Sequence, residues 1–281
     1  MDLRRLSSAD RAVLIYDLAV LALLAALGRG LPFWQGLAAL HLLLVPAVWI
    51  LAGAGRSRER SLAHFLHLGY PLALLLVLYP EVGVLRHLIV PRDLDSLVAG
   101  WDALLFPGRI YATVPPRLPV AVLELLHGVY FSYYLLLPLP ALALWSRRAY
   151  AEMSAYVAVL THCMLAHYAF SLLFPVSGPV ALRAKVMPEG FLFLPLMERV
   201  YEGFDRGGVA FPSTHAAVTV IAGFFAARLF PRLRWLFVLL AVAILVSTVL
   251  CIYHYPIDTA AGVLTGGLFL AAHRASGSRH D

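Results

Sequence analysis

Long apolar runs dominate this chain and constrain its fold more than any other feature. About eight of them are long enough, or nearly so, to cross a hydrocarbon core of roughly 30 Å. They cover approximately residues 12–28, 33–53, 63–80, 119–146, 152–174, 211–229, 235–253 and 257–273. Of the 281 residues, 61% are hydrophobic and 14% are charged, and a soluble domain of this length could not bury so much apolar surface. The sequence therefore predicts an all-α, polytopic integral membrane protein with about eight transmembrane helices.

The connections between the apolar runs divide into two sets by charge. One set is rich in arginine and contains Arg4, Arg5, Arg11, Arg56, Arg58, Arg60, Arg147, Arg148, Arg232, Arg234, Arg274 and Arg279. Arginine in short connections marks the cytoplasmic side of a membrane protein, so both termini are predicted to be cytoplasmic. The other set, 81–118, 175–210 and the turn at 254–256, is then exoplasmic.

The net charge of +6 comes mainly from arginine. A basic soluble protein would suggest a nucleic-acid partner, but these arginines occur in short clusters between apolar runs. That distribution is typical of membrane topology rather than of a nucleic-acid-binding face. The lipid bilayer is therefore the expected partner, with no nucleic acid, and no oligomeric state is predicted.

The connection 81–118 is predicted to contain a short amphipathic helix on the membrane surface, ending at Pro107-Gly108. Its apolar residues are Leu94, Leu97, Val98, Trp101, Leu104, Leu105 and Phe106, and its acidic residues are Asp93, Asp95 and Asp102. We interpret the three aspartates as solvated surface residues rather than as ligands of a cation.

Two histidines and an aspartate are expected to meet at one depth of the membrane. His215 stands at the start of the sixth apolar run, and His254 stands at the end of the seventh. The chain between them has the length of one helical hairpin, so at roughly 1.5 Å per residue it crosses and returns to the same level. Asp258 follows four residues after His254. Ionisable residues inside a membrane are costly, and such a group indicates a functional site.

The residue types around these histidines suit the chemistry of a phosphate ester. Ser213 and Thr214 are good helix caps, and a helix start offers free N–H groups and a positive dipole end to an anion. Asp258 can accept a hydrogen bond from one imidazole nitrogen of His254 and leave the other as a free lone pair. His215 can then donate a proton to a leaving oxygen. The sequence thus predicts an enzyme that breaks a phosphate bond.

Both motifs resemble those of a known family. Pro212-Ser213-Thr214-His215 and Ser247-x6-His254-Tyr255-Pro256-x-Asp258-x3-Gly262 are similar to the second and third motifs of the type 2 phosphatidic acid phosphatase superfamily. The span layout extends the likeness over roughly 119–273. The resemblance implies a six-helix catalytic core and chemistry without a metal or cofactor. It also implies that His254 attacks phosphorus to form a phosphohistidine, that His215 protonates the leaving group, and that Asp258 orients His254.

The chain departs from the family pattern at two places. Thr248 stands where the third motif usually has arginine, and the usual first motif, Lys-x6-Arg-Pro, is absent. In its expected location the chain reads Phe174-Pro-Val-Ser-Gly-Pro179. Both departures are similar to the inositol phosphorylceramide synthase branch, which transfers a phospho-head group from a phospholipid to a lipid hydroxyl. The candidate phosphate-binding residues are Ser213 and the cations of 175–210, namely Arg183, Lys185 and Arg206.

These patterns predict an N-terminal two-helix membrane segment, 1–62, followed by a catalytic membrane domain, 63–281, whose core motifs lie within 174–262. The expected substrate is a phospholipid or lipid phosphate, and the expected reaction is phosphotransfer to a lipid hydroxyl. Hydrolysis of a lipid phosphate or diphosphate, with water as the acceptor, is the alternative. A more distant alternative is a transporter that uses the histidines as a proton relay.

Overall fold

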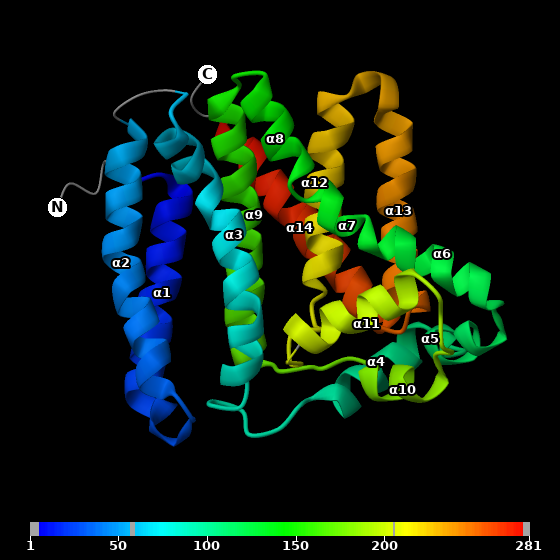
Figure 1. The fold of residues 1–281 in the computed structure, drawn as a ribbon. Helices are drawn as coiled ribbons and strands as arrows, with labels where there is room; N and C mark the ends of the chain where they lie inside the picture. The colour runs from blue at the N-terminus through cyan, green and yellow to red at the C-terminus, as the bar shows by residue number, and fades with distance from the viewer. Residues whose placement is uncertain (1–5, 57–59, 205, 278–281) are drawn as a thin grey trace.

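The computed structural model of the protein describes residues 6–56, 60–204 and 206–277 (Figure 1). These residues form helices and connecting loops, with an isolated parallel bridge between Val176 and Val209. The predicted all-α fold class is therefore confirmed. Four of the arginines assigned to the cytoplasmic side, Arg4, Arg5, Arg58 and Arg279, lie outside the described residues.

The longer helices are α1 (Ser8–Leu27), α2 (Trp34–Arg56), α3 (Leu62–Leu85), α9 (Tyr150–Leu173), α12 (Thr214–Leu229), α13 (Arg234–Leu250) and α14 (Pro256–Gly277). The shorter ones are α4 (Asp95–Leu105), α5 (Ile110–Thr113), α6 (Val120–Phe131), α7 (Tyr133–Leu136), α8 (Leu139–Ser146), α10 (Val180–Val186) and α11 (Phe193–Phe204). Short 3₁₀ turns, η2 (Gly28–Gly30), η3 (Pro115–Arg117) and η4 (Pro231–Leu233), join some of them.

Within the described part of the chain, six helical stretches are long and apolar enough to cross a membrane. They are Ser8–Gly30, Trp34–Gly55, Leu62–Leu85, Val120–Ser146, Tyr150–Leu173 and Pro231–Leu250. The other two predicted spans correspond to α12, a shorter apolar helix of 16 residues, and to α14, which carries Asp258 and Arg274. The polytopic membrane fold is thus confirmed, and the total of eight spans stays a prediction.

Prolines affect the third and fourth predicted spans differently. Pro71 and Pro80 both lie inside α3, which nevertheless continues over 24 residues and extends beyond the predicted 63–80. The run 119–146 instead breaks into α6, α7 and α8 at Ser132 and Pro138. Proline lacks an amide hydrogen and interrupts the helical ladder, which accounts for the break at Pro138, whereas no proline stands at the break at Ser132. The break turns α6 away from the direction of the long helices (Figure 1).

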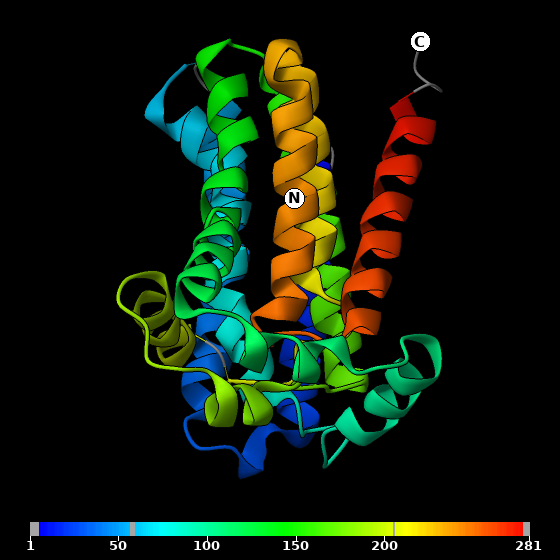
Figure 2. The ribbon, with the colours of Figure 1, turned by 90° about the vertical axis from the view of Figure 1, so that its right-hand side faces the viewer.

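The long helices pack around one hydrophobic core. Helices α1, α2, α3 and α9 lie side by side, and α12 and α13 form a hairpin that α14 packs against (Figures 1 and 2). The core draws buried side chains from α1, α2, α3, α7, α8, α9, α12, α13 and α14, including Val13, Leu78, Leu160, Ile221 and Leu270. The predicted segment 1–62 therefore shares a core with the rest of the chain, and a domain boundary at residue 62 stays a prediction.

Buried ionisable pairs join the first three helices. His41 on α2 lies between two carboxylates, 2.6 Å from Asp17 on α1 and 2.8 Å from Glu81 on α3. Nearby, Asp10 of α1 contacts His67 of α3 at 3.0 Å. Charged groups in an apolar interior must be paired, so these contacts fix the relative positions of α1, α2 and α3.

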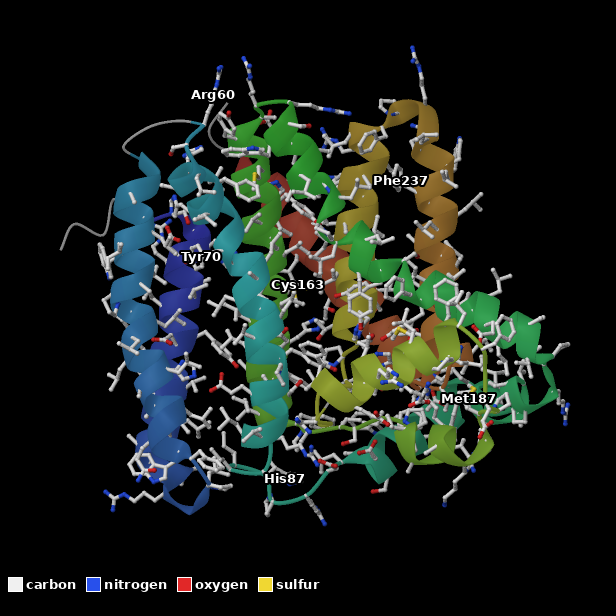
Figure 3. The ribbon with its side chains drawn as sticks, in the orientation of Figure 1. Arg60, Tyr70, His87, Cys163, Met187 and Phe237 are labelled. Carbon is white, nitrogen blue, oxygen red and sulfur yellow. The ribbon has the colours of Figure 1, made fainter. Side chains whose placement is uncertain are left out.

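The two sets of connections gather at opposite ends of the bundle. Figure 3 places Arg60 at the end that carries the turns α8–α9 and α12–α13, and His87 at the other end. Connections 81–118 and 175–210, with helices α4, α5, α10 and α11, lie at the His87 end (Figures 1 and 2). The structure thus separates the arginine-bearing turns from the motif-bearing loops. Which side of the membrane each end faces stays a prediction.

The amphipathic helix predicted within 81–118 is present as α4, which ends at Leu105, just before Pro107-Gly108. Its residues Leu104 and Leu105 are exposed, at 82% and 66% of their surface, whereas Val98 is buried. This arrangement of apolar side chains suits a helix that lies against a membrane interface.

Candidate active site

His215, His254 and Asp258 lie together at the end of the bundle that carries the long connections. The ring centroids of His215 and His254 are 5.8 Å apart, and Asp258 Oδ2 lies 3.6 Å from His254 Nδ1. His254 and Asp258 are buried, and His215 is half-buried. The helical hairpin α12–α13 therefore returns the two imidazoles to the same level, as the sequence predicts.

Ser213 caps α12 and joins it to α14. Its hydroxyl accepts a hydrogen bond from Ala216 N at 3.2 Å, as a helix cap does. Its own backbone N–H donates to the carbonyl oxygen of Asp258 at 3.0 Å. The first turns of α12 and α14 are thus held against each other, and His254 lies between them.

Glycines allow α14 to pack directly on the backbone of α12. A Cβ atom on Gly262 would collide with the carbonyl oxygen of Ser213 and lie 2.8 Å from the Cβ of Ala216. A Cβ on Gly266 would lie 2.6 Å from the carbonyl oxygen of Ala217. Small residues in membrane helices permit such close backbone contact, and here that contact sets the distance between Asp258 and Ser213.

His254 lies in a tight turn between α13 and α14. The carbonyl oxygen of Thr248 accepts hydrogen bonds from the N–H groups of both Tyr253 and His254, at 3.1 Å each. Asp258 Oδ2 accepts the N–H of Tyr255 at 2.8 Å, and Pro256 begins α14, a position that proline favours. The turn is thus fixed by its own backbone, so the His254 side chain projects from a rigid base.

The hydrogen bonds of His254 define its tautomer. Nδ1 lies 3.1 Å from the carbonyl oxygen of Ala210, which can only accept, so Nδ1 carries the proton. Nε2 therefore has a free lone pair, and Ser213 Oγ lies 3.1 Å from it. Asp258 Oδ2 also faces Nδ1, at 3.6 Å, and accepts the N–H of Tyr255. The expected role of Asp258 in orienting His254 stays a prediction.

Two loops hold Ala210 in place. Ala210 N donates to the carbonyl oxygen of Val176 at 2.7 Å, and Gly208 N donates to Ser177 Oγ at 3.1 Å. Gly178 has a φ of +78°, and a Cβ there would lie 2.8 Å from the carbonyl oxygen of Tyr253, so only glycine fits. The proline-rich stretch Phe174–Pro179 therefore supports the carbonyl group that binds His254.

Aspartates of 81–118 hold the same loops. Asp95 accepts the N–H groups of Ser177 and Gly178 at 3.0 and 2.7 Å, and Asp102 accepts the N–H of Ile257, at the start of α14, at 2.9 Å. The interpretation of these residues as solvated is wrong for Asp102, which is 1% exposed, because it meets a helix-start N–H that lacks an intrahelical acceptor. Burial raises the pKa of Asp102, opposed by the Ile257 N–H. Among the described residues, no group of three or more His, Cys, Asp or Glu could hold a metal ion.

The substitution Asp102→Ala should destabilise the start of α14. Loss of a capping acceptor costs about 0.5–2 kcal/mol of folding free energy, and the displaced turn should also lower turnover. Asp102→Asn keeps an oxygen that can accept from Ile257 N and should be milder in both respects. Thermal unfolding in detergent, together with turnover, measures both effects. An Asp102→Ala protein as stable and active as the parent would show that this hydrogen bond has no such role.

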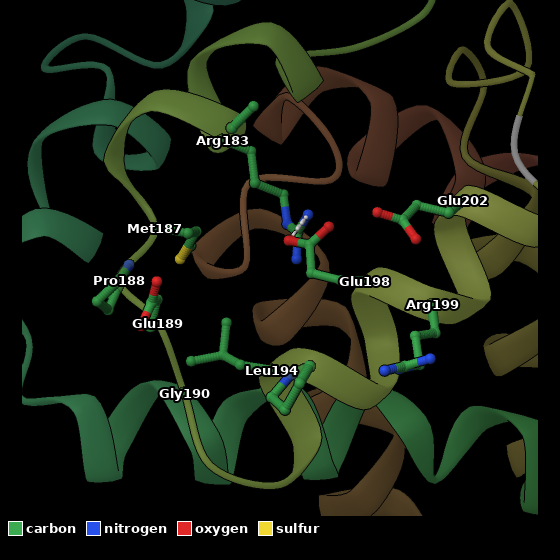
Figure 4. Close-up of a pocket in the computed structure, with 11 residues that line it drawn as sticks. Arg183, Met187, Pro188, Glu189, Gly190, Leu194, Glu198, Arg199 and Glu202 are labelled. Atoms are coloured by element: carbon green, nitrogen blue, oxygen red, sulfur yellow. Dashed lines mark ion pairs between the residues drawn. The ribbon is translucent and has the colours of Figure 1, made fainter.

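The structure does not bring Arg183 to the histidines. Its side chain is buried, with Nη1 2.6 Å from Glu198, Nε donating to the Cys251 carbonyl oxygen at 3.1 Å, and the guanidinium 4.5 Å from the Tyr253 ring centroid. It lines a cavity of about 590 Å³ between α10 and α11 (Figure 4). Arg183 thus supports the back of the turn that carries His254.

The remaining cations differ in position. Lys185 is exposed on α10, and Arg206 is exposed beside Gly83 of α3. The sequence reasoning missed Arg86, whose Nη1 would lie 3.0 Å from a Cβ on Gly207. Gly207 lines a narrow recess together with Ser177 and His254. Its position in the sequence could have indicated this residue, because Arg86 belongs to the connection 81–118, and the charge pattern places that connection on the same side of the membrane as His254.

Comparison with known families agrees with this geometry. The family model of the PAP2 superfamily matches residues 119–272. The chain belongs to the PAP2 superfamily. The match includes α6 through most of α14, and so contains both histidines and Asp258, whereas α1 to α5 precede it. No curated protein and no solved structure matches the chain. The predicted superfamily is thereby confirmed, and this PAP2 protein belongs with membrane phosphatases and phosphotransferases.

Proposed function

We propose that this PAP2 protein is a lipid phosphotransferase that works through a phosphohistidine on His254. The main supporting observation is the hydrogen bonding of the His254 ring: Nδ1 donates to Ala210 O at 3.1 Å, so Nε2 is unprotonated and its lone pair faces Ser213 Oγ at 3.1 Å, where the phosphate is proposed to bind. In the proposed reaction, the phospho-head group of a phospholipid moves to a lipid hydroxyl. The PAP2 superfamily includes both phosphatases and phosphotransferases, and this proposal selects the second of these activities.

In the first step, Nε2 of His254 attacks phosphorus, and the bond between phosphorus and the lipid oxygen breaks. His215, whose ring centroid is 5.8 Å from that of His254, donates a proton to the departing oxygen, and a lipid alcohol leaves. The imidazole then bears positive charge, and the buried Asp258 carboxylate at 3.6 Å stabilises it. Asp258 Oδ1 has no hydrogen-bond partner among the described residues, so it remains available to that charge.

In the second step, the acceptor hydroxyl gives its proton to His215 and attacks phosphorus, and the bond to Nε2 breaks. His254 and His215 then return to their starting protonation states. A lipid hydroxyl as acceptor yields a new phospholipid, whereas water yields a free head-group phosphate. Thr248 at the arginine position of the third motif and the proline-rich stretch Phe174–Pro179 support the lipid acceptor, because both resemble the phosphotransferase branch.

The phosphate group is proposed to lie between Ser213 and the recess beside His254. Ser213 Oγ and the start of α12 supply a hydroxyl, N–H groups and the positive end of the helix dipole. Arg86 and Arg206 are the proposed cations, because Gly207 lines this recess, Arg86 lies against Gly207 and Arg206 precedes it in the chain. Arg86 also lies 3.4 Å from Asp93, whereas Arg183 pairs with Glu198 behind the turn and Lys185 lies on α10. Thr248, at the arginine position of the family motif, bonds to Thr259 at 2.9 Å and supports a site with fewer cations.

The proposed orientation puts this site on the exoplasmic side and both termini in the cytoplasm. It is supported by the gathering of the described arginine-bearing turns at the opposite end of the bundle (Figure 3).

Product analysis tests the transfer reaction. Purified protein in nanodiscs would receive a phospholipid with a labelled head-group phosphate, with and without a long-chain lipid alcohol. We expect a new labelled phospholipid only when the alcohol is present, detected by thin-layer separation and mass spectrometry. Free labelled head-group phosphate as the main product under both conditions would replace transfer with hydrolysis. The same sample, quenched in alkali, should carry label on the protein.

A further inference from the structure

An apolar groove leads along α3 to His215. A cavity of about 270 Å³ is lined by Thr214 and His215 of α12 and by side chains of α3, α6, α7, α9 and α11. A second cavity of about 360 Å³ continues between α3, α8 and α9. The two cavities share the side chains of Leu76 and Tyr134. The two cavities therefore adjoin at these side chains, and the groove, as the two are called together, extends from Phe65 to the proposed proton donor.

The lining of this groove excludes a charged or strongly polar ligand. Apart from His215, its residues are aliphatic, aromatic, methionine, proline, glycine or threonine. From Phe65 to Tyr79 it follows α3 for about 20 Å, at roughly 1.5 Å per residue. A narrow apolar track of that length fits an extended hydrocarbon chain better than a head group.

The groove is open to the side of the bundle. Leu76 of α3 and Phe204 of α11 both line it and are 50% and 57% exposed, so a chain can enter between these helices. Helix α11 is held in place by Glu124 of α6, whose carboxylate accepts the N–H groups of Phe191, Leu192, Phe193 and Leu194. Both walls of the opening are therefore fixed helices.

We infer that this groove binds the hydrocarbon chain of a lipid alcohol, with its hydroxyl oxygen at His215 and its tail along α3. The inference rests on the proposed function: the donor's alcohol leaves from the position at His215 in the first step, and the hydroxyl of the acceptor alcohol takes that position and attacks in the second. The substrate class is thus a long-chain alcohol. Because α3 lines both cavities from Phe65 to Tyr79, its side chains set the length of tail that is accepted, and α3 precedes the matched segment 119–272.

Filling the distal half of the groove tests the inference. Gly69 and Ala73 lie on the groove face of α3, and the nearest atom to a Cβ on Gly69 is 3.9 Å away. The variants Gly69→Phe and Ala73→Phe each add a ring at the lining of the cavity of about 360 Å³. Val77→Phe is the matched control, because Val77 lies on the same helix, is 56% exposed and lines neither cavity. Each protein is assayed with a dioctanoyl phospholipid donor and with octyl or hexadecyl alcohol as acceptor.

We expect both groove variants to lower kcat/KM for hexadecyl alcohol by about ten-fold or more, since several methylenes lose their apolar contacts. Octyl alcohol should react as in the parent in Gly69→Phe, because Gly69 lies about 15 Å along α3 from Tyr79, beyond the end of an eight-carbon chain. In Ala73→Phe, about 9 Å from Tyr79, octyl alcohol should lose less than hexadecyl alcohol, and Val77→Phe should leave both acceptors unchanged. An unchanged ratio of the two acceptors in both groove variants would overturn the groove, as would equal losses on both acceptors in Gly69→Phe. If the parent protein forms neither a phosphohistidine nor a new phospholipid, the proposed function itself fails, which is a separate outcome.

Discussion

His254→Ala should abolish both transfer and hydrolysis, with turnover reduced by at least about 10⁴-fold, as expected when a catalytic nucleophile is removed. The fold should persist, because the turn is fixed by the backbone bonds to the Thr248 carbonyl oxygen, which the substitution keeps. Turnover of a labelled phospholipid and alkali-stable label on the protein measure the effect, and neither should remain above background.

His162→Ala provides the control for this experiment. His162 is a histidine on α9 whose Nδ1 bonds to the Ala158 carbonyl oxygen, and its Nε2 contacts Ser8 of α1, away from the candidate site. Its replacement should leave turnover and protein labelling as in the parent. If His254→Ala still trapped phosphate on the protein, the assignment of His254 as the attacking group would be wrong.

Gly262→Ala should reduce turnover by roughly 10²-fold, which is the scale expected when reacting groups are misplaced by about 1 Å. The added methyl group meets the carbonyl oxygen of Ser213 and the Cβ of Ala216, so α14 must move away from α12. That movement separates Asp258 and His254 from Ser213 and breaks the bond between Ser213 N and Asp258 O. Overpacking of this kind also costs about 1–3 kcal/mol of folding free energy.

Gly267→Ala is the matched control, because a Cβ at Gly267 meets nothing within 4 Å. It lies on the same helix and adds the same methyl group, so any change in helix propensity is shared. Turnover and thermal unfolding in detergent should therefore differ between the two variants. Equal behaviour of the two proteins would mean that close packing at Gly262 does not position the site.

The fold class could be predicted because the apolar runs exceed what a soluble core can hold. That His215 and His254 lie at the same level could be predicted because the two helices between them, α12 and α13, have nearly equal lengths. That prediction requires no knowledge of tertiary contacts. The break of the fourth span at Ser132 and Pro138, and the continuity of α3 through Pro71 and Pro80, were not predictable. Whether a proline breaks a helix depends on what the neighbouring helices supply to the freed backbone groups.

The polar surroundings of the site were predicted less well, because they depend on long-range contacts. Asp102 and Ile257 are 155 positions apart in the chain, and no local pattern links them. Arg183 lies on the same connection as the sequence places it, but the sequence could not show which way its side chain points. Glu198 and the Tyr253 ring hold it behind the turn, and only the packing of α10 on α11 reveals this.

The hydrogen bonds from Asp95 and Asp102 have a consequence for how this enzyme could be dissected. Both aspartates precede residue 119, where the family match begins, yet they accept N–H groups from Ser177, Gly178 and Ile257 inside it. A fragment cut at the edge of the homologous region would keep His215, His254 and Asp258 but leave those amides without these acceptors. We therefore expect the cooperative folding unit to extend beyond the matched segment, and a chimaera should carry α3 and α4 along with the motifs.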